Sequence, residues 1–258
     1  MAFQEVLKLV KKHRSDSNHS ELEIRIGSFS TEGNFTAGYN SNHIKVINRL
    51  NSRLKKTCAA FPTTWVLVPQ YSYIVGDHGE NIRSTVIPNK EPEIIKKTRV
   101  NFVNLTSDRP MHLRVTLSNE IPIKSNEVLK RIQKTPPISV RYVQRASFIH
   151  ILKMGCKKVE FRVDISKVGF SGSNKLEATK AHNEKGDNCS YHCETELVTK
   201  LRPITDKKLE HREDEFIAEA ILSFGKSLLG SFEIQSDGSS VQLPAANLYL
   251  LNSDIGIN

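Results

Sequence analysis

Alternation of apolar and polar residues with a period of two runs through the middle of the chain. Seven segments rich in β-branched residues and separated by Gly, Pro, Asn and Asp predict strands at 64–75, 81–87, 93–104, 111–118, 138–153, 157–168 and 190–199. Helical spacing of apolar residues predicts amphipathic helices at 2–13, 41–57 and 206–229. Thr205 or Asp206 can cap the last helix, and Gly230 ends it. The pattern predicts a mainly β (α+β) protein with a many-stranded antiparallel sheet.

Two segments far apart in the chain share a Glu-x-Glu spacing, which places both carboxylates on one face of a strand. The pairs are Glu21 with Glu23, and Glu194 with Glu196. If the two strands meet, their carboxylates can bind one hard divalent cation, which prefers oxygen ligands. An ordinary half-exposed strand whose charged face meets water has the same spacing, so one copy alone does not establish a metal site.

Other predicted strands also combine a charged face with an apolar face. His112 and Arg114 alternate with aliphatic residues in one strand, and Arg162 and Asp164 do so in another. A β-sandwich turns its polar faces to solvent, and such faces seldom mix acids, bases and hydroxyls in so many strands. A closed barrel with enough strands can instead enclose a polar lumen. The sequence therefore predicts a closed antiparallel β-barrel tunnel with a polar lumen and flanking helices on its apolar outside.

The charge of the chain favours a polyanionic partner. Lys and Arg number 37 against 28 Asp and Glu, which gives a net charge of +9 and a pI near 9.3. Many of the basic residues lie inside predicted strands, so the positive charge can line a cavity. No apolar run is long enough to cross a bilayer, and the four cysteines form no framework of close pairs, so we expect a cytoplasmic protein with reduced thiols and no membrane partner.

Several motifs in sequential order resemble the triphosphate tunnel metalloenzyme (CYTH-like) family. Within it, they resemble the metal-dependent mRNA-capping RNA 5′-triphosphatases of fungi and large DNA viruses, over about residues 20 to 225. The segment 21–27 is similar to the opening strand of that family, and Glu194 and Glu196 match the alternating glutamates of its last strand. The intervening matches are 113–118 followed by 120–122, 140–148 and 161–166.

The resemblance implies a role for each matched residue. It implies Mg²⁺ or Mn²⁺ as the cofactor, held by Glu21, Glu23, Glu194 and Glu196. The implied phosphate-binding residues are Arg25, Arg83, Lys97, Arg114, Arg141, Arg145, Arg162, Asp164 and Ser166. The implied catalytic residues are Glu194, Arg114, Arg145 and Arg162. The implied reaction removes the γ-phosphate from 5′-triphosphate RNA in the first step of mRNA capping, with hydrolysis of nucleoside triphosphates (NTPs) as a second activity.

Two positions depart from the family pattern. His192 stands where a third glutamate is expected, and Val143 stands where a phosphate-binding lysine is expected. Two alternatives therefore remain open. One is a tunnel phosphatase for a small substrate such as tripolyphosphate or thiamine triphosphate, and the other is a non-catalytic RNA-binding β-domain of a capping complex.

The composition of the chain changes after the last predicted helix. Residues 231–258 contain no Lys or Arg and carry Gly, Ser and Pro at 238–244. We therefore predict a triphosphatase domain at 1–230 and a linker or the start of a following module at 231–258. The resemblance implies that a guanylyltransferase module follows or associates with the chain, and a viral member would act in a viral factory or virion.

Overall fold

The computed structural model describes residues 2–16, 19–38, 66–75, 80–86, 90–107, 111–124, 126–154, 157–172, 178, 189–201, 206–230 and 248–250. The first elements are α1 (Ala2–Ser15), β1 (Ser20–Phe29), β2 (Phe35–Ala37), β3 (Val66–Val75), β4 (Glu80–Thr85) and β5 (Glu93–Ser107). They are followed by β6 (His112–Pro122), α3 (Asn126–Lys134), β7 (Ser139–Met154), β8 (Lys157–Ser171), β9 (Cys189–Leu197), α5 (Lys207–Gly230) and β10 (Leu248–Leu250). The predicted helix at 41–57 lies outside the described residues.

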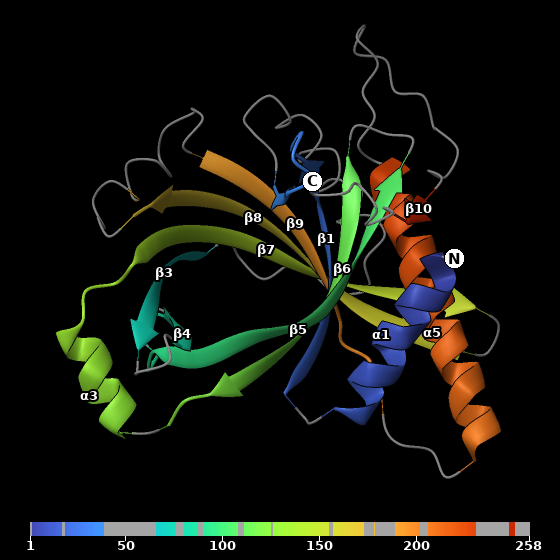
Figure 1. Ribbon diagram of the computed structural model, residues 1–258, viewed down its shortest axis with the longest axis horizontal. Helices are drawn as coiled ribbons and strands as arrows, with labels where there is room; N and C mark the ends of the chain where they lie inside the picture. The colour runs from blue at the N-terminus through green and yellow to red at the C-terminus, as the bar shows by residue number, and fades with distance from the viewer. Residues whose placement is uncertain are drawn as a thin grey trace, which may run out of the picture.

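Eight of the described strands close into an antiparallel barrel (Figure 1). Their order is β5, β4, β3, β7, β8, β9, β1 and β6, and β6 pairs back onto β5. The first and last strands of the barrel sequence meet directly, because Glu23 on β1 pairs with Glu196 on β9. The predicted closed barrel is confirmed, and it brings together segments from opposite ends of the chain.

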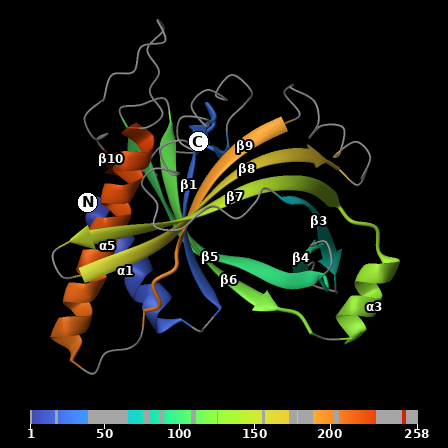
Figure 2. The same ribbon diagram turned by 180° about the vertical axis from the view of Figure 1, so that it is seen from behind.

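The hydrophobic core lies between the outer surface of the barrel and two helices. Outward-facing residues such as Ile24, Val115 and Phe161 are almost fully buried together with Val10 of α1 and Ile217 of α5. Figures 1 and 2 show α1 and α5 side by side against the same part of the barrel. Each buried aliphatic or aromatic side chain contributes roughly 1.5–3 kcal/mol relative to exposure. The apolar faces of the strands therefore point outward, which leaves the charged faces for the lumen.

The ends of α5 agree with the sequence signals. Asp206 accepts hydrogen bonds from the backbone N–H groups of Lys208 at 2.9 Å and Leu209 at 3.3 Å, so it is the N-cap that the sequence offered. The helix ends at Gly230. The capping oxygen satisfies N–H groups that would otherwise have no partner in the first turn.

Three elements were not predicted: α3, β2 and β10. Helix α3 has nine residues and buries Ile132, which packs against Ile82 of β4. Apolar residues at helical spacing over only nine positions give a weaker signal than the alternation of the neighbouring strands. Strand β2 has three residues, too few for alternation to be recognised. The strand predicted at 111–118 continues to Pro122, which matters for the site described below.

Of residues 231–258, the structure describes Leu248–Leu250, which form β10 and pair antiparallel with the end of β5. The division into a domain at 1–230 and a linker or further module at 231–258 stays a prediction. No helix among the described residues is long and apolar enough to cross a membrane.

Candidate active site

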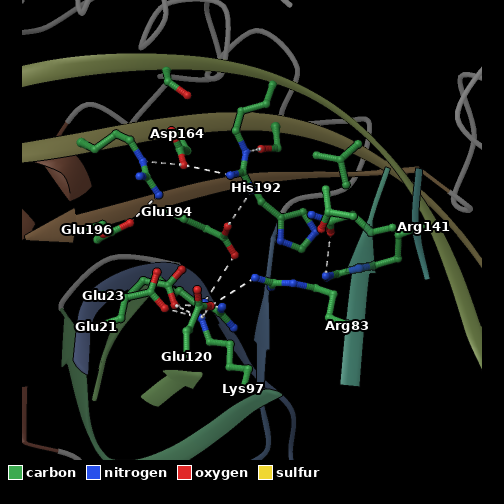
Figure 3. A pocket seen from close by; sticks show the side chains of 18 of the residues that line it. Glu21, Glu23, Arg83, Lys97, Glu120, Arg141, Asp164, His192, Glu194 and Glu196 are labelled. Atoms are coloured by element: carbon green, nitrogen blue, oxygen red, sulfur yellow. Dashed lines mark hydrogen bonds and ion pairs between the residues drawn. The ribbon is translucent and has the colours of Figure 1, made fainter. Parts of the chain in front are cut away.

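The lumen of the barrel holds a cavity of about 680 Å³ that is lined almost entirely by polar and charged side chains (Figure 3). Alternate residues of each strand point into it, as the period of two requires. The predicted site residues among the lining are Glu21, Glu23, Arg25, Arg83, Lys97, Arg141, Arg145, Arg162, Asp164, Ser166, Glu194 and Glu196. The structure thus gathers twelve of the thirteen residues predicted from the sequence into one cavity.

Lys97 lies among three carboxylates on one side of the lumen. Its Nζ is 2.5 Å from Glu21 Oε2, 2.9 Å from Glu120 Oε1 and 3.7 Å from Glu23 Oε2. Burial raises the pKa of Glu21 and Glu23 because it disfavours the charged form, and neighbouring carboxylates add to the rise. Burial lowers the pKa of Lys97, but the three carboxylates outweigh it and the net pKa is raised. The ammonium therefore stays charged and compensates the acidic cluster.

Glu194 lies opposite this cluster and is surrounded by cations. Arg25 Nε is 3.4 Å from Glu194 Oε1, and Arg145 Nη2 is 3.6 Å from Glu194 Oε2. Burial opposes ionisation, but Arg25 and the other neighbouring arginines, Arg145 and Arg141, bring the pKa of Glu194 down to about 2. Arg25 also contacts Glu23 at 2.9 Å, so it links the two glutamate pairs.

Arg162 and Arg145 enclose a third acidic group. Arg162 forms a short ion pair with Glu196, and its Nε lies 3.2 Å from Asp164 Oδ2. Arg145 Nη1 is 3.1 Å from the same Asp164 oxygen, and Arg145 Nε donates to Ser166 Oγ at 3.2 Å. These contacts orient both guanidinium groups across the lumen.

Arg83 of β4 and Arg141 of β7 supply further positive charge to the lumen. Arg83 Nη2 is 3.1 Å from Glu120 Oε1, and Arg141 Nη2 donates to Gln70 Oε1 at 3.0 Å. The pKa of Arg141 is lowered, first by burial and then by Arg83, while Glu194 raises it. Arg141 forms no ion pair with a carboxylate within the described part of the chain. The lumen therefore offers an under-compensated guanidinium to an anionic ligand.

Arg114 is the predicted site residue that does not line the cavity. It pairs with Arg25 across β1 and β6, so it shares the inner face of the sheet. However, its guanidinium does not reach the cavity and instead contacts the rings of Phe35 on β2 and Phe102 on β5. The structure does not support the predicted placement of Arg114 around the triphosphate.

Glu120 is a lumen residue that was missed as a site residue. The predicted strand ended at residue 118, whereas β6 continues to Pro122 and carries Glu120 into the cavity. Continuing the alternation from Ser118 by two residues would have identified it. His192 and Val143, the two departures from the family pattern, both line the lumen. His192 Nε2 is 2.8 Å from Ser190 Oγ, and burial is the main cause of its lowered pKa.

The donor set fits an oxygen-seeking divalent cation. Among the described residues, no three acidic, His or Cys side chains are grouped closely enough to bind a metal as they stand. Lys97 and Arg25 lie between the carboxylates, and this separates them. Glu23 Oε2 and Asp164 Oδ1 are nevertheless buried without a hydrogen bond to the described chain, although Arg25 Nη2 lies 2.9 Å from Glu23 Oε2. Buried carboxylate oxygens with unused lone pairs suit Mg²⁺ or Mn²⁺.

Solved structures with the same fold come from fission yeast. The S. pombe Pct1 RNA triphosphatase matches with a TM-score of 0.59 and 13% identity, over 88% of this chain and 91% of that chain. The same protein in complex with the Spt5 CTD matches with a TM-score of 0.63 and 12% identity, over 88% of this chain and 93% of that chain. At these identities the similarity demonstrates the tunnel fold alone. Comparison with curated protein sequences gives no significant match.

The sequence itself provides the assignment to a family. Residues 72–224, more than half of the 258 residues, match the family described as mRNA capping enzyme, beta chain. The match includes Glu194 and Glu196 but begins after β1, and the barrel brings Glu21 and Glu23 of β1 beside them. The chain belongs to the mRNA capping enzyme beta-chain family, and it is an RNA 5′-triphosphatase of mRNA capping.

Proposed function

We propose that the lumen removes the γ-phosphate of 5′-triphosphate RNA with the help of Mg²⁺ or Mn²⁺ bound by Glu21, Glu23 and Glu196, with Glu194 nearby. Enzymes of this family depend on a metal ion. The observation that carries the assignment is the antiparallel pairing of Glu23 with Glu196 inside a polar cavity. When bound, the metal ion neutralises negative charge on the terminal phosphate and polarises its oxygens.

The arginines of β7 and β8 bind the terminal phosphate. Arg145 and Arg162 both point into the lumen and are held by Asp164, so little side-chain entropy is lost when a phosphate binds. Their planar guanidinium groups suit phosphate oxygens. As the bond between the γ-phosphorus and the bridging oxygen breaks, they stabilise the charge on the equatorial oxygens.

The other cations of the lumen hold the rest of the triphosphate. Arg83 and Arg141 reach the lumen from β4 and β7, and Arg25 and Lys97 reach it from β1 and β5. Ser166 adds a hydroxyl donor beside Arg145. Binding of an anion to Arg141 supplies the negative partner that the described chain lacks at this position.

Glu194 orients the attacking water. A charged carboxylate in the lumen accepts a hydrogen bond from the water and directs its oxygen at the γ-phosphorus. The new P–O bond forms in line with the bridging P–O bond that breaks, and the products are diphosphate-ended RNA and inorganic phosphate. No covalent enzyme intermediate is needed. Because the lining residues suit phosphate and metal and not a particular base, we propose NTP hydrolysis as a second activity.

The test uses conservative changes of the proposed metal ligands. Glu21→Gln and Glu196→Gln keep side-chain size and remove charge, and we expect each to reduce phosphate release from γ-labelled RNA by roughly 100-fold or more. Mn²⁺ binding measured by calorimetry should weaken in parallel. Glu127→Gln on α3, where Glu127 is exposed, is the matched control and should change neither. Wild-type rates in the Glu21 and Glu196 variants would refute the assignment.

A second assay addresses the small-substrate alternative. Tripolyphosphate and thiamine triphosphate should compete with 5′-triphosphate RNA for the same lumen but have lower kcat/KM values. A preference for either small substrate over RNA would replace the proposed substrate while retaining the metal site.

A further inference from the structure

The inner surface of the barrel does not end where the cavity ends. Arg25 lines the cavity, and Arg114 lies directly beside it on β6, paired in turn with Asn104 on β5. In this region β1 exchanges one neighbour for another: it pairs with β9 up to Arg25 and with β2 from Gly27 onward. The lumen face therefore continues onto β1, β2, β5 and β6 beyond the cavity.

Arg114 is clamped between two aromatic rings on this surface. Its Cζ lies 4.5 Å from the ring centroid of Phe35 and 4.5 Å from that of Phe102. Its Nε donates to Asn104 Oδ1 at 2.7 Å, which sets the orientation of the guanidinium plane. Both faces of the guanidinium are thus covered, and the Nη groups on its edge remain available to a ligand.

The described residues do not compensate the positive charge of this surface. None of the carboxylates in the described chain forms an ion pair with Arg114. Its pKa is lowered to about 10 by burial and by the positive charges of Arg99 and Arg25. Arg99 Cζ also lies 5.5 Å from the Phe102 centroid. Arg25 at the edge of the cavity thus has two further arginines near it, and both Arg99 and Arg114 lie over the ring of Phe102.

The aromatic component is both accessible and supported. Phe102 is 40% exposed although it is a large apolar residue. The ring of Phe35 packs against that of Phe29, with centroids 5.3 Å apart, and the ring of Phe29 packs against His112, with centroids 5.2 Å apart. An exposed aromatic ring beside arginines that no described carboxylate pairs with is the arrangement with which proteins stack bases of single-stranded nucleic acid while holding its backbone.

We propose that Phe35, Arg99, Phe102 and Arg114 form an aromatic–arginine platform that binds the first unpaired nucleotides of the RNA whose triphosphate occupies the lumen. A base stacks on the exposed face of Phe102, and the edge of Arg114 binds a backbone phosphate. This inference rests on the proposed function of the lumen. It gives the enzyme contacts with RNA that tripolyphosphate lacks.

Two features of the platform favour RNA as its ligand: it continues the lumen face, and its aromatic and arginine side chains suit bases and phosphates. The platform and the lumen share one sheet face, so a chain whose 5′ end lies in the lumen passes over it without a break. Base stacking accepts any base, and this suits an enzyme that acts on transcripts of different sequence. The phosphate backbone supplies the anion that the described residues do not provide to Arg99 and Arg114.

The decisive variant is Phe102→Leu, which retains apolar volume but removes the aromatic face. Stacking of one base contributes roughly 1–3 kcal/mol, so we expect KM for 5′-triphosphate RNA to rise about tenfold. The KM for tripolyphosphate should stay at the wild-type value. Phe102→Trp retains an aromatic face and should restore RNA binding. Leu209→Ala, at an exposed apolar site on α5, is the control for surface truncation.

A binding experiment separates the platform from the lumen. Fluorescence anisotropy with 5′-hydroxyl single-stranded RNA, which has no triphosphate, should show weaker binding for Phe102→Leu and Arg114→Gln. An unchanged affinity and an unchanged RNA KM in Phe102→Leu would overturn the platform even if hydrolysis is normal. Absence of metal-dependent hydrolysis of any triphosphate by the wild type would instead refute the proposed function of the lumen.

Discussion

The Nζ atom of Lys97 lies 2.5 Å from Glu21 Oε2, in the middle of the acidic cluster to which we assign the metal ion. Glu120 approaches the same ammonium at 2.9 Å and Glu23 at 3.7 Å. A tethered cation thus provides the charge that these buried carboxylates require. A divalent ion that uses Glu21 and Glu23 must compete with Lys97 for the same oxygens.

We therefore predict that Lys97→Met binds Mn²⁺ more tightly than the wild type. Two unit charges 4 Å apart interact by about 4 kcal/mol at an effective dielectric constant of 20, so removal of the competing charge should raise affinity at least about tenfold. Without metal the variant should melt at a lower temperature, because the carboxylates lose their cation. Calorimetry and thermal melts with and without Mn²⁺ measure both effects. Weaker Mn²⁺ binding would show that Lys97 assists the metal site.

Val143→Lys tests the departure from the family pattern at Val143. The new ammonium would lie on the same strand face as Arg141 and Arg145, which also line the lumen. Burial, together with these two arginines, already lowers the pKa of His192, so the lumen disfavours additional positive charge. We expect Val143→Lys to lower the melting temperature, whereas Val143→Leu, which adds volume without charge, lowers it less. Adding His192→Glu to Val143→Lys should recover part of the loss through a coupling energy of about 1 kcal/mol. Additive effects in this double-mutant cycle would show that the two departures are independent.

The buried ion pair between α1 and α5 makes a prediction about stability. Arg14 Nε is 2.7 Å from Asp214 Oδ1, and both side chains are almost fully buried. Arg14→Ala leaves the Asp214 charge without this partner, which should cost about 3–5 kcal/mol in urea denaturation. The double variant Arg14→Met with Asp214→Leu should recover most of that loss. The control is Lys12→Met, which removes an exposed ion pair and should cost less than about 1 kcal/mol.

The meeting of the two Glu-x-Glu strands could be predicted, but the contacts of Lys97 could not. Alternation assigns Glu21, Glu23, Glu194 and Glu196 to polar faces, and closure of the barrel then brings those faces together. The residue that Lys97 faces across the sheet depends on the register between β5 and β6, which pairs Lys97 with Glu120. A one-residue shift reverses every side chain that follows, and no local pattern reports it.

Arg114 illustrates a second limit. Its face was predicted correctly, because it pairs with Arg25 on the inner surface. Its distance along the strand was not, because the cavity ends where β9 gives way to β2 as the neighbour of β1. That exchange depends on the three-residue strand β2, which is too short to give a period-two signal.

The pH dependence of stability should include a contribution from His13 in the last turn of α1. His13 Nδ1 lies 2.6 Å from Ser20 Oγ, and its pKa is lowered from the ordinary value of 6.5 by burial and by Arg14, while Asp16 opposes the shift. The unfolded chain therefore binds a proton at His13 more readily than the folded protein. The resulting stabilisation is fully present above pH 6.5 and is lost as the pH falls through that value toward the folded pKa.

His13→Gln removes this titration while retaining a polar side chain beside Ser20. Because the pKa values of His112 and His192 are also lowered by burial, they contribute in the same direction. We therefore expect the unfolding free energy of the variant to fall less between pH 7 and pH 5 than that of the wild type. Urea denaturation across that pH range measures both. Equal slopes for His13→Gln and the wild type would show that His13 takes up its proton equally well in the folded and unfolded states.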